Sequence, residues 1–197
     1  TKVKRPWLQK ELLTTVTARL KVLKAGWILN GGSLYGQNWF KQGVKREVLI
    51  ECLCSGRARA LAQDVQSHAG ARGLMQLMPA TARETARKHG ISYRGSHQLF
   101  EPEINITLGS RYYREMLQRF DNNRILATAA YNAGPHRVST WLKKSQGSLP
   151  FDAWIETIPF LETRNYVQNV LAFSMIYAHH LESEARILSE KEKRRRL

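Results

Sequence analysis

The chain has 197 residues, of which 43% are hydrophobic and 24% charged, and its formal net charge is +15. This length and composition are typical of one globular domain, or one domain with an appendage, and they exclude an intrinsically disordered chain. No stretch approaches the roughly 20 apolar residues of a membrane span, and the first residues lack the pattern of a signal peptide.

The positive charge is unevenly distributed along the chain. Residues 1–60 contain 12 Lys and Arg against 3 Asp and Glu, whereas residues 61–181 contain 13 against 9. A basic protein can bind nucleic acid, anionic lipid or an anionic wall polymer, and solvated surface lysines are the alternative interpretation. The excess belongs mainly to the N-terminal part.

Neither the cysteines nor the histidines predict a metal site. Cys52 and Cys54 are too close in sequence for a good disulfide, and one C-x-C without partner ligands is a weak zinc signal. The 6 histidines have no ligand spacing. We therefore expect two free thiols, no metal and no cofactor.

Residues 1–46 are predicted to form an N-terminal appendage. Leu8, Leu12, Val16 and Leu20 repeat at helical spacing, which indicates an amphipathic helix. Residues 26–46 combine five glycines with aromatic side chains, a composition typical of a loop. Residues 47–62 favour a helix that Gly56 weakens.

From residue 79 onward, Pro and Gly delimit a series of predicted helices. Pro79, Pro102 and Pro135 suit the first turn of a helix, and Gly90 and Gly134 suit its end. The sequence predicts a helix over 79–89 and a second from 102 to about 120. After a capping turn at 121–123, a third helix ends at 134, a fourth begins at 135, and a last one covers about 162–181. Loops are predicted at 91–101 and 147–150. Residues 190–196 are predicted to be a charged tail that frays. No strand alternation is visible, so the predicted fold class is mainly α.

Three short motifs carry the polar side chains that stand out against this helical background. Residues 70–79 read GARGLMQLMP, in which Gln76 is the only amide of an apolar run. Residues 130–135 read AYNAGP and place Tyr131 and Asn132 at a helix end. Residues 156–167 read ETIPFLETRNYV, with Glu162 and Tyr166 on one helix face.

In this order, the three motifs resemble the soluble lytic transglycosylase family. Its members are similar to goose-type lysozyme and cleave the glycan strands of bacterial peptidoglycan. The resemblance covers about residues 60–180 and implies a lysozyme-like helical catalytic domain, which we place at residues 47–181, before a charged tail at 182–197. It also implies a location in the bacterial periplasm or cell envelope, with peptidoglycan and other envelope proteins as partners.

The resemblance implies a single catalytic Glu, which protonates the leaving oxygen and then acts as a base toward the sugar's own 6-hydroxyl, leaving a 1,6-anhydro-muramyl end. In the family this Glu lies twelve residues before the first Gly of the first motif, a position that Ala58 occupies here. Alanine cannot transfer a proton. Glu51 is the first candidate substitute, although it lies about 10 Å of helical rise away. A frame shift across residues 26–59, an inactivating substitution and a natural pseudoenzyme stay open as explanations.

The resemblance also implies which residues bind the glycan. They are Ser67, whose family counterpart hydrogen-bonds the acid, with Met75, Gln76, Met78, Tyr131, Asn132, Glu162 and Tyr166. We expect Gln76, Tyr131 and Glu162 to face one groove. The structural alternatives are a helix C-cap at the second motif and an N-terminal helix charge for Glu162. Arg164 could pair with Glu162 or Asp152.

Different classes of function follow from these observations. The leading prediction is a lytic transglycosylase domain for MurNAc–GlcNAc bonds, with its acid missing from this chain. The alternative is a catalytically inactive peptidoglycan-binding or scaffold protein with the same site. A nucleic-acid binder is disfavoured because the excess charge lies mostly outside residues 61–181.

Overall fold

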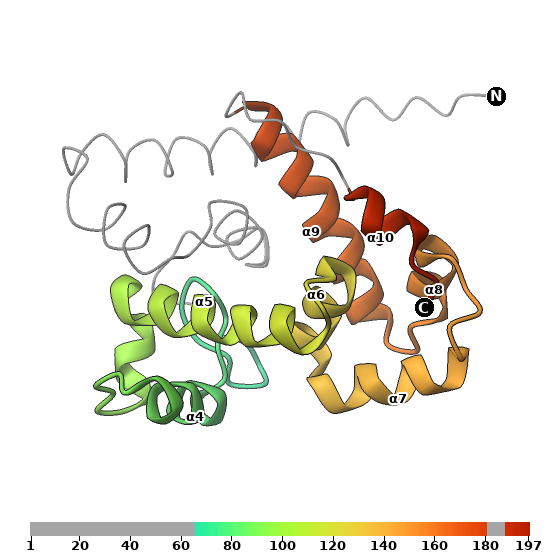
Figure 1. Cartoon of the computed structure of the whole chain (residues 1–197). Helices are drawn as coiled ribbons and strands as arrows, with labels where there is room; N and C mark the ends of the chain where they lie inside the picture. Colours follow the sequence, from blue (N-terminus) through green and yellow to red (C-terminus); the bar gives the residue numbers. More distant parts are fainter. Residues whose placement is uncertain (1–65, 181–187) are drawn as a thin grey trace.

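The computed structural model describes residues 66–180 and 188–197, which are mostly helical (Figure 1). The elements are α4 Pro79–His89, the 3-10 helix η1 Ser96–Phe100, α5 Pro102–Arg119, α6 Arg124–Ala133, α7 Pro135–Ser145, α8 Phe151–Thr157, α9 Leu161–His180 and α10 Glu190–Arg194. The predicted mainly α fold is confirmed, since β-pairing in the described residues is limited to two isolated bridges. None of the helices described is long and apolar enough to cross a membrane.

Several sequence predictions concern residues outside this described part. They include the appendage at residues 1–46, the two cysteines and the positions of Glu51 and Ala58. The domain boundaries at 47–181 and 182–197 therefore stay predictions.

α6 is the central helix of the described structure. It packs against α5, α7 and α9, and Figure 1 shows it where these three helices meet. Ala127, Ala129 and Ala130 are fully buried, and such small side chains let neighbouring helices approach closely. Ile125 and Leu126 fill the core at the beginning of the helix. Most of α6 is therefore buried among other elements, whereas Asn132 in its last turn is exposed.

Proline, glycine and asparagine set the helix boundaries, as the sequence predicts. Pro79, Pro102 and Pro135 lie in the first turns of α4, α5 and α7. α4 ends at Gly90, whose φ of 62° is in the left-handed region that glycine adopts freely. The Asn123 side chain caps α6 by accepting a 3.1 Å hydrogen bond from a backbone N–H in its first turn.

Three helices differ from the sequence predictions. The short 3-10 helix η1 lies within the predicted loop at 91–101. α8 has no counterpart among the predicted elements, because its 7 residues are too few to show helical periodicity. In place of the predicted fraying tail, Ser189 and Glu192 form a capping box at the start of α10. Leu197 is 3% exposed and exchanges backbone hydrogen bonds of 2.8 and 3.1 Å with Leu149. The prediction of fraying is wrong because a capped helix and a buried leucine hold this segment on the core.

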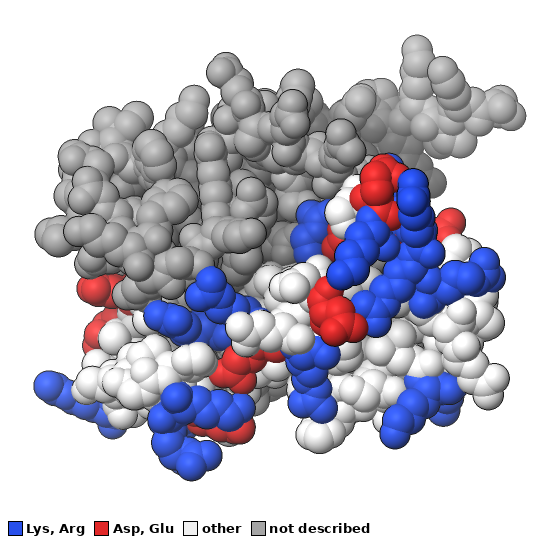
Figure 2. Space-filling model, in the orientation of Figure 1, with Lys and Arg blue, Asp and Glu red and all other residues white. Residues whose placement is uncertain are grey.

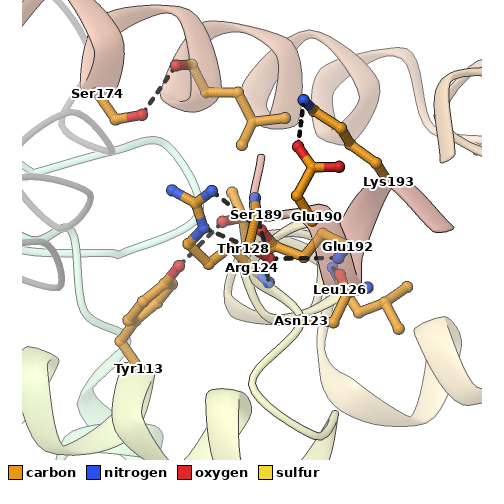
Figure 3. Close-up of polar contacts among 11 residues, drawn as sticks. Tyr113, Asn123, Arg124, Leu126, Thr128, Ser174, Ser189, Glu190, Glu192 and Lys193 are labelled. Atoms are coloured by element: carbon orange, nitrogen blue, oxygen red, sulfur yellow. Dashed lines mark hydrogen bonds and ion pairs between the residues drawn. The ribbon is translucent and has the colours of Figure 1, made fainter. Parts of the chain in front are cut away.

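Glu192 connects the C-terminal segment to the centre of the fold (Figure 3). Its carboxylate is 5% exposed and accepts hydrogen bonds from the Arg124 backbone at 2.9 Å and from the Arg124 guanidinium at 3.0 and 3.1 Å. It also accepts from the backbone N–H and hydroxyl of Ser189, at 2.7 and 2.8 Å. Burial opposes the charged form, but these hydrogen bonds outweigh burial and hold the pKa of Glu192 below its ordinary value.

We expect Glu192→Gln to lower the free energy of unfolding by about 2–4 kcal/mol at neutral pH, because a mostly buried guanidinium loses its charged partner. Since the folded-state pKa is depressed, this contribution is present above the ordinary carboxyl pKa and is lost as the pH falls through the folded-state value. Urea unfolding of both proteins from about pH 7 down to about pH 3 should show the two stability curves converging in acid.

Glu190→Gln is the control for this prediction. Its carboxylate lies on the same short helix but is exposed, and it pairs with Lys193 at 2.9 Å. We expect this change to alter the free energy of unfolding by less than about 1 kcal/mol. A gap between wild type and Glu192→Gln that stays constant into acid contradicts the assignment.

Candidate functional site

The first motif forms a tight loop that leads into α4. Arg72 and Leu77 exchange backbone hydrogen bonds of 3.0 and 3.1 Å, which close the loop as an antiparallel bridge. The preceding turn is closed by Ser67, whose backbone N–H donates to the Ala71 carbonyl at 2.8 Å and whose Oγ accepts from the Ala71 N–H at 3.0 Å. Ser67 thus orders the entry to the loop. Its predicted contact with the catalytic acid stays a prediction, because position 58 lies outside the described residues.

A buried asparagine on α5, absent from the predicted site, holds this loop in place. Asn105 is fully buried, and its Oδ1 accepts a 2.7 Å hydrogen bond from the Met75 N–H. Its Nδ2 donates to the carbonyls of Arg72 and Leu99, both at 2.8 Å. One side chain therefore satisfies three backbone groups of two segments. In the sequence it is a lone amide between two isoleucines, a pattern that does not separate it from a solvent-facing helix residue.

Close approaches at two glycines fix the depth of the loop. Gly73 has a φ of 73°, and a Cβ there would lie 2.0 Å from the carbonyl oxygen of Leu99. On α5, a Cβ at Gly109 would lie 2.5 Å from the sulfur of Met75. Met75 is 1% exposed and belongs to the main core, which differs from the expectation that its side chain contacts substrate. The reason is that Gly109 leaves a gap, which the flexible thioether fills.

Gln76 and Met78 lie beyond this buried part of the loop. Gln76 has a φ of 47°, and the left-handed conformation costs a non-glycine residue roughly 1–2 kcal/mol. Its backbone N–H and its Nε2 both donate to the Gly73 carbonyl, at 3.0 and 2.9 Å, which stabilises this conformation. Met78 is 40% exposed. Strained backbone of this kind is concentrated at functional sites, so the loop is the first part of the candidate site.

Tyr131 joins the loop to the C-terminal turn of α6. Its hydroxyl donates a 2.9 Å hydrogen bond to the Met75 carbonyl. Its ring packs against those of Tyr112 and Tyr113 on α5, with centroids 5.4 and 5.9 Å away. As predicted, Tyr131 lies near the end of a helix, which stops before Gly134. The second motif is therefore in direct contact with the first.

Asn132 joins the same turn of α6 to the beginning of α9. Its Oδ1 accepts a 2.6 Å hydrogen bond from the hydroxyl of Thr163, which is buried. Glu162 precedes Thr163 and is exposed, and Tyr166 follows one turn later and is half-buried. The third motif therefore begins beside the end of the second.

Arg164 pairs with neither of the two carboxylates considered from the sequence. Its guanidinium donates to the Ile158 carbonyl at 2.9 and 3.3 Å and lies 3.6 Å from the Glu156 carboxylate. Glu156 also accepts a 2.7 Å hydrogen bond from Gln168. Arg164 thus ties the α8–α9 connection to α9. Neither Glu162 nor Asp152 is needed for this role.

Two hydrogen bonds, Tyr131 to Met75 and Thr163 to Asn132, therefore bring the three motifs together at the end of α6. That Gln76, Tyr131 and Glu162 face one groove stays a prediction. Over residues 66–180 and 188–197, no group of His, Cys, Asp and Glu could hold a metal ion.

Comparison with protein families identifies the class of this domain. Residues 60–153 match the family described as Transglycosylase SLT domain, and residues 157–185 match the Soluble lytic transglycosylase helical domain. Two family models of soluble lytic transglycosylases thus match neighbouring parts of this chain, and the resemblance that the motifs indicate is confirmed.

Individual relatives agree with this family. The chain is 50% identical over 133 residues to the soluble lytic murein transglycosylase of Salmonella typhimurium, and 47% identical over 133 residues to that of Escherichia coli. Each match covers 67% of this chain and 21% of the relative. The chain therefore spans about a fifth of the length of these curated relatives.

Solved structures share the helical fold. An inactive mutant of lytic transglycosylase Slt from Pseudomonas aeruginosa matches with a TM-score of 0.72 and 44% identity, over 81% of this chain and 25% of that chain. The 70 kDa soluble lytic transglycosylase of Escherichia coli matches with a TM-score of 0.73 and 41% identity, over 78% of this chain and 25% of that chain. The predicted lysozyme-like helical class is thus the fold of known lytic transglycosylases.

We expect Gly73→Ala to destabilise the domain by about 1–3 kcal/mol more than Gly70→Ala. Both glycines have positive φ, at 73° and 89°, so both substitutions carry the left-handed penalty. Only at Gly73 does the added Cβ meet backbone, whereas at Gly70 nothing lies within 4 Å. Urea unfolding of the two variants measures the difference in their free energies of unfolding. Equal values would show that the loop accommodates the added Cβ at Gly73 without strain.

Proposed function

We propose that residues 60–180 form the glycan-binding domain of a peptidoglycan lytic transglycosylase. The observation that carries this proposal is the meeting of the three family motifs at the end of α6, through the contacts of Tyr131 and Asn132. The relatives are named soluble lytic murein transglycosylases, which supports murein as the polymer bound. We infer an envelope location and peptidoglycan strands as the partner on the same grounds.

The proposed glycan contacts come from all three motifs. They are Gln76 and Met78 of the loop, Tyr131 and Asn132 of α6, and Glu162 and Tyr166 of α9, with Ser67 ordering the loop entry. The exposure of Met78, Asn132 and Glu162 supports a surface that a sugar chain can reach. Met75 contributes through its carbonyl oxygen, which holds the Tyr131 hydroxyl.

The proposed reaction is cleavage of the MurNAc–GlcNAc bond by one carboxyl group. That group protonates the leaving oxygen and then removes the proton of the sugar's 6-hydroxyl, whose oxygen closes the 1,6-anhydro ring. Water is not consumed. With Ala58 at the position of the acid, the chain as written lacks the group for both proton transfers.

A second candidate function is supported by this same alanine. A domain that keeps the glycan contacts but lacks the acid would bind peptidoglycan without cleaving it, as a scaffold or targeting module. Nucleic acid is a weaker candidate, because most of the excess positive charge lies in residues 1–60, outside the family motifs. On the described face in Figure 2, blue side chains predominate and red ones lie among them. Binding to DNA would fall steeply with salt, whereas binding to uncharged chitooligosaccharide would not.

We expect Glu162→Ala and Tyr166→Phe each to weaken binding of a muropeptide or chitooligosaccharide by about 3- to 30-fold, since each removes one hydrogen-bonding group from the proposed surface. Isothermal titration calorimetry measures the affinities, and thermal melting checks that both variants stay folded.

Glu103→Ala is the matched control for Glu162→Ala. Glu103 is an exposed carboxylate in the first turn of α5, as Glu162 is in the first turn of α9, so the pair separates glycan binding from helix-dipole effects. Unchanged affinity in both site variants contradicts the proposed contacts.

We expect the chain as written to release anhydro-muropeptides from purified peptidoglycan at least about 10²- to 10⁴-fold more slowly than an active family member, because general acid catalysis alone contributes that much. Ala58→Glu combined with Arg59→Ser should restore part of the rate. Removing Arg59 matters because a neighbouring cation lowers a carboxyl pKa and opposes the acid role. Mass spectrometry of the digest measures both.

Ala58→Gln combined with Arg59→Ser is the control, since glutamine has nearly the shape of glutamate but no acidic proton. Rate recovery in the Glu variant alone assigns the chemistry to that carboxyl. Wild-type release equal to that of an active relative would show that another acid, with Glu51 first to be tested, serves instead.

A further inference from the structure

Arg137 and Phe160 form a pair beside the candidate site. Arg137 lies in the first turn of α7, and its Nη1 donates a 3.0 Å hydrogen bond to the Ala133 carbonyl. Its guanidinium carbon is 5.3 Å from the centre of the Phe160 ring. Phe160 is 45% exposed, and its ring packs edge-on against Trp141 with centroids 5.6 Å apart. A carbonyl and a braced aromatic ring therefore hold the guanidinium in position.

The charge of Arg137 is left for a ligand. Arg124 and Arg164 have carboxylate partners at 3.0 and 3.6 Å, whereas no Asp or Glu within residues 66–180 and 188–197 forms an ion pair with Arg137. Arg137 is an exposed residue, so a ligand in solution can reach it. An immobilised guanidinium with free donors is preorganised for the two oxygens of a carboxylate.

The position of the pair relates it to the proposed glycan contacts. Ala133, which anchors Arg137, follows Asn132, and Phe160 precedes Glu162 by two residues. The guanidinium therefore borders the site where the end of α6 meets the start of α9. Groups that project sideways from a strand bound at Asn132 and Glu162 would be within its reach.

We propose that Arg137, positioned by Phe160, binds a carboxylate carried by the muramyl residues of the glycan strand. This inference rests on the proposed function and deepens it. Each muramyl residue bears a lactyl group, whose carboxylate is either free or joined to a stem peptide with its own carboxylates, whereas chitooligosaccharides carry none. The subsite thus distinguishes peptidoglycan from uncharged N-acetylglucosamine chains.

Arg137→Gln should weaken binding of a disaccharide–tetrapeptide muropeptide about tenfold and leave chitooligosaccharide affinity within about twofold. It should also remove much of the salt dependence of muropeptide binding. Arg137→Lys should lie between wild type and Gln, because it keeps the charge without the planar fork. Phe160→Leu should produce a smaller loss confined to the muropeptide. Calorimetry with both ligands measures all of these.

Arg87→Gln is the matched control, since Arg87 is an exposed arginine on α4 that also forms no ion pair with the described carboxylates. A peptide-free GlcNAc–MurNAc disaccharide separates the two sources of carboxylate. If Arg137→Gln weakens binding of this disaccharide, the bound carboxylate belongs to the lactyl group. If Arg137→Gln weakens binding of the muropeptide alone, it belongs to the stem peptide.

The failures of the two proposals are distinguishable. Unchanged muropeptide affinity in Arg137→Gln, with Glu162→Ala still weakening both ligands, overturns the carboxylate subsite and leaves the proposed function intact. Equal losses for both ligands in Arg137→Gln also overturn the subsite, because they show an indirect effect through Ala133. A wild-type chain that binds neither ligand overturns both proposals.

Discussion

The arrangement of the candidate site depends on the hydrogen bonds of one buried amide. A loop that enters the core takes backbone groups away from water, and each of them needs a partner. Asn105 supplies both kinds of hydrogen-bond partner, an acceptor for the Met75 N–H and donors for two carbonyls. The carbonyl of Met75 in turn accepts from Tyr131. Both polar backbone atoms of Met75 thus have a partner, one on α5 and the other on α6, so a shift of the loop would break these hydrogen bonds.

α6 is clamped in a similar way at its two ends. At its beginning, Arg124 is bound by Glu192, so the C-terminal segment stabilises the helix through a mostly buried ion pair. At its end, Asn132 is bound by Thr163 of α9. Small buried residues occupy the turns between these clamps. The side chains near the end of α6 therefore project from a helix that is bonded to other segments at both ends. A rigid helix of this kind can position a binding surface precisely.

Much of the fold could be predicted from the sequence because the residues that begin and end the helices act locally. Pro102, Gly90 and Asn123 act on their own helix ends, so their effect is visible without knowing the tertiary structure. The contacts that hold the loop and the C-terminal segment are not local. Asn105 contacts Met75, 30 residues away, and Glu192 contacts Arg124, 68 residues away. Their patterns, an amide within an apolar helix and an acid within a basic run, are ordinary ones. Family motifs located the three site segments, but burial of Met75 depends on Gly109, which no motif contains.

The hydrogen bonds at the end of α6 also determine which hydrogen-bonding roles, donor or acceptor, remain for Tyr131 and Asn132. The Tyr131 hydroxyl uses its single proton on the Met75 carbonyl, so toward any further group its oxygen can only accept. Asn132 uses its oxygen on Thr163, which leaves its NH₂ group as the outward donor. Neighbouring residues in the chain thus present opposite polarity. A molecule touching both must donate at one point and accept at the next, which a secondary amide does and a row of like-charged groups does not.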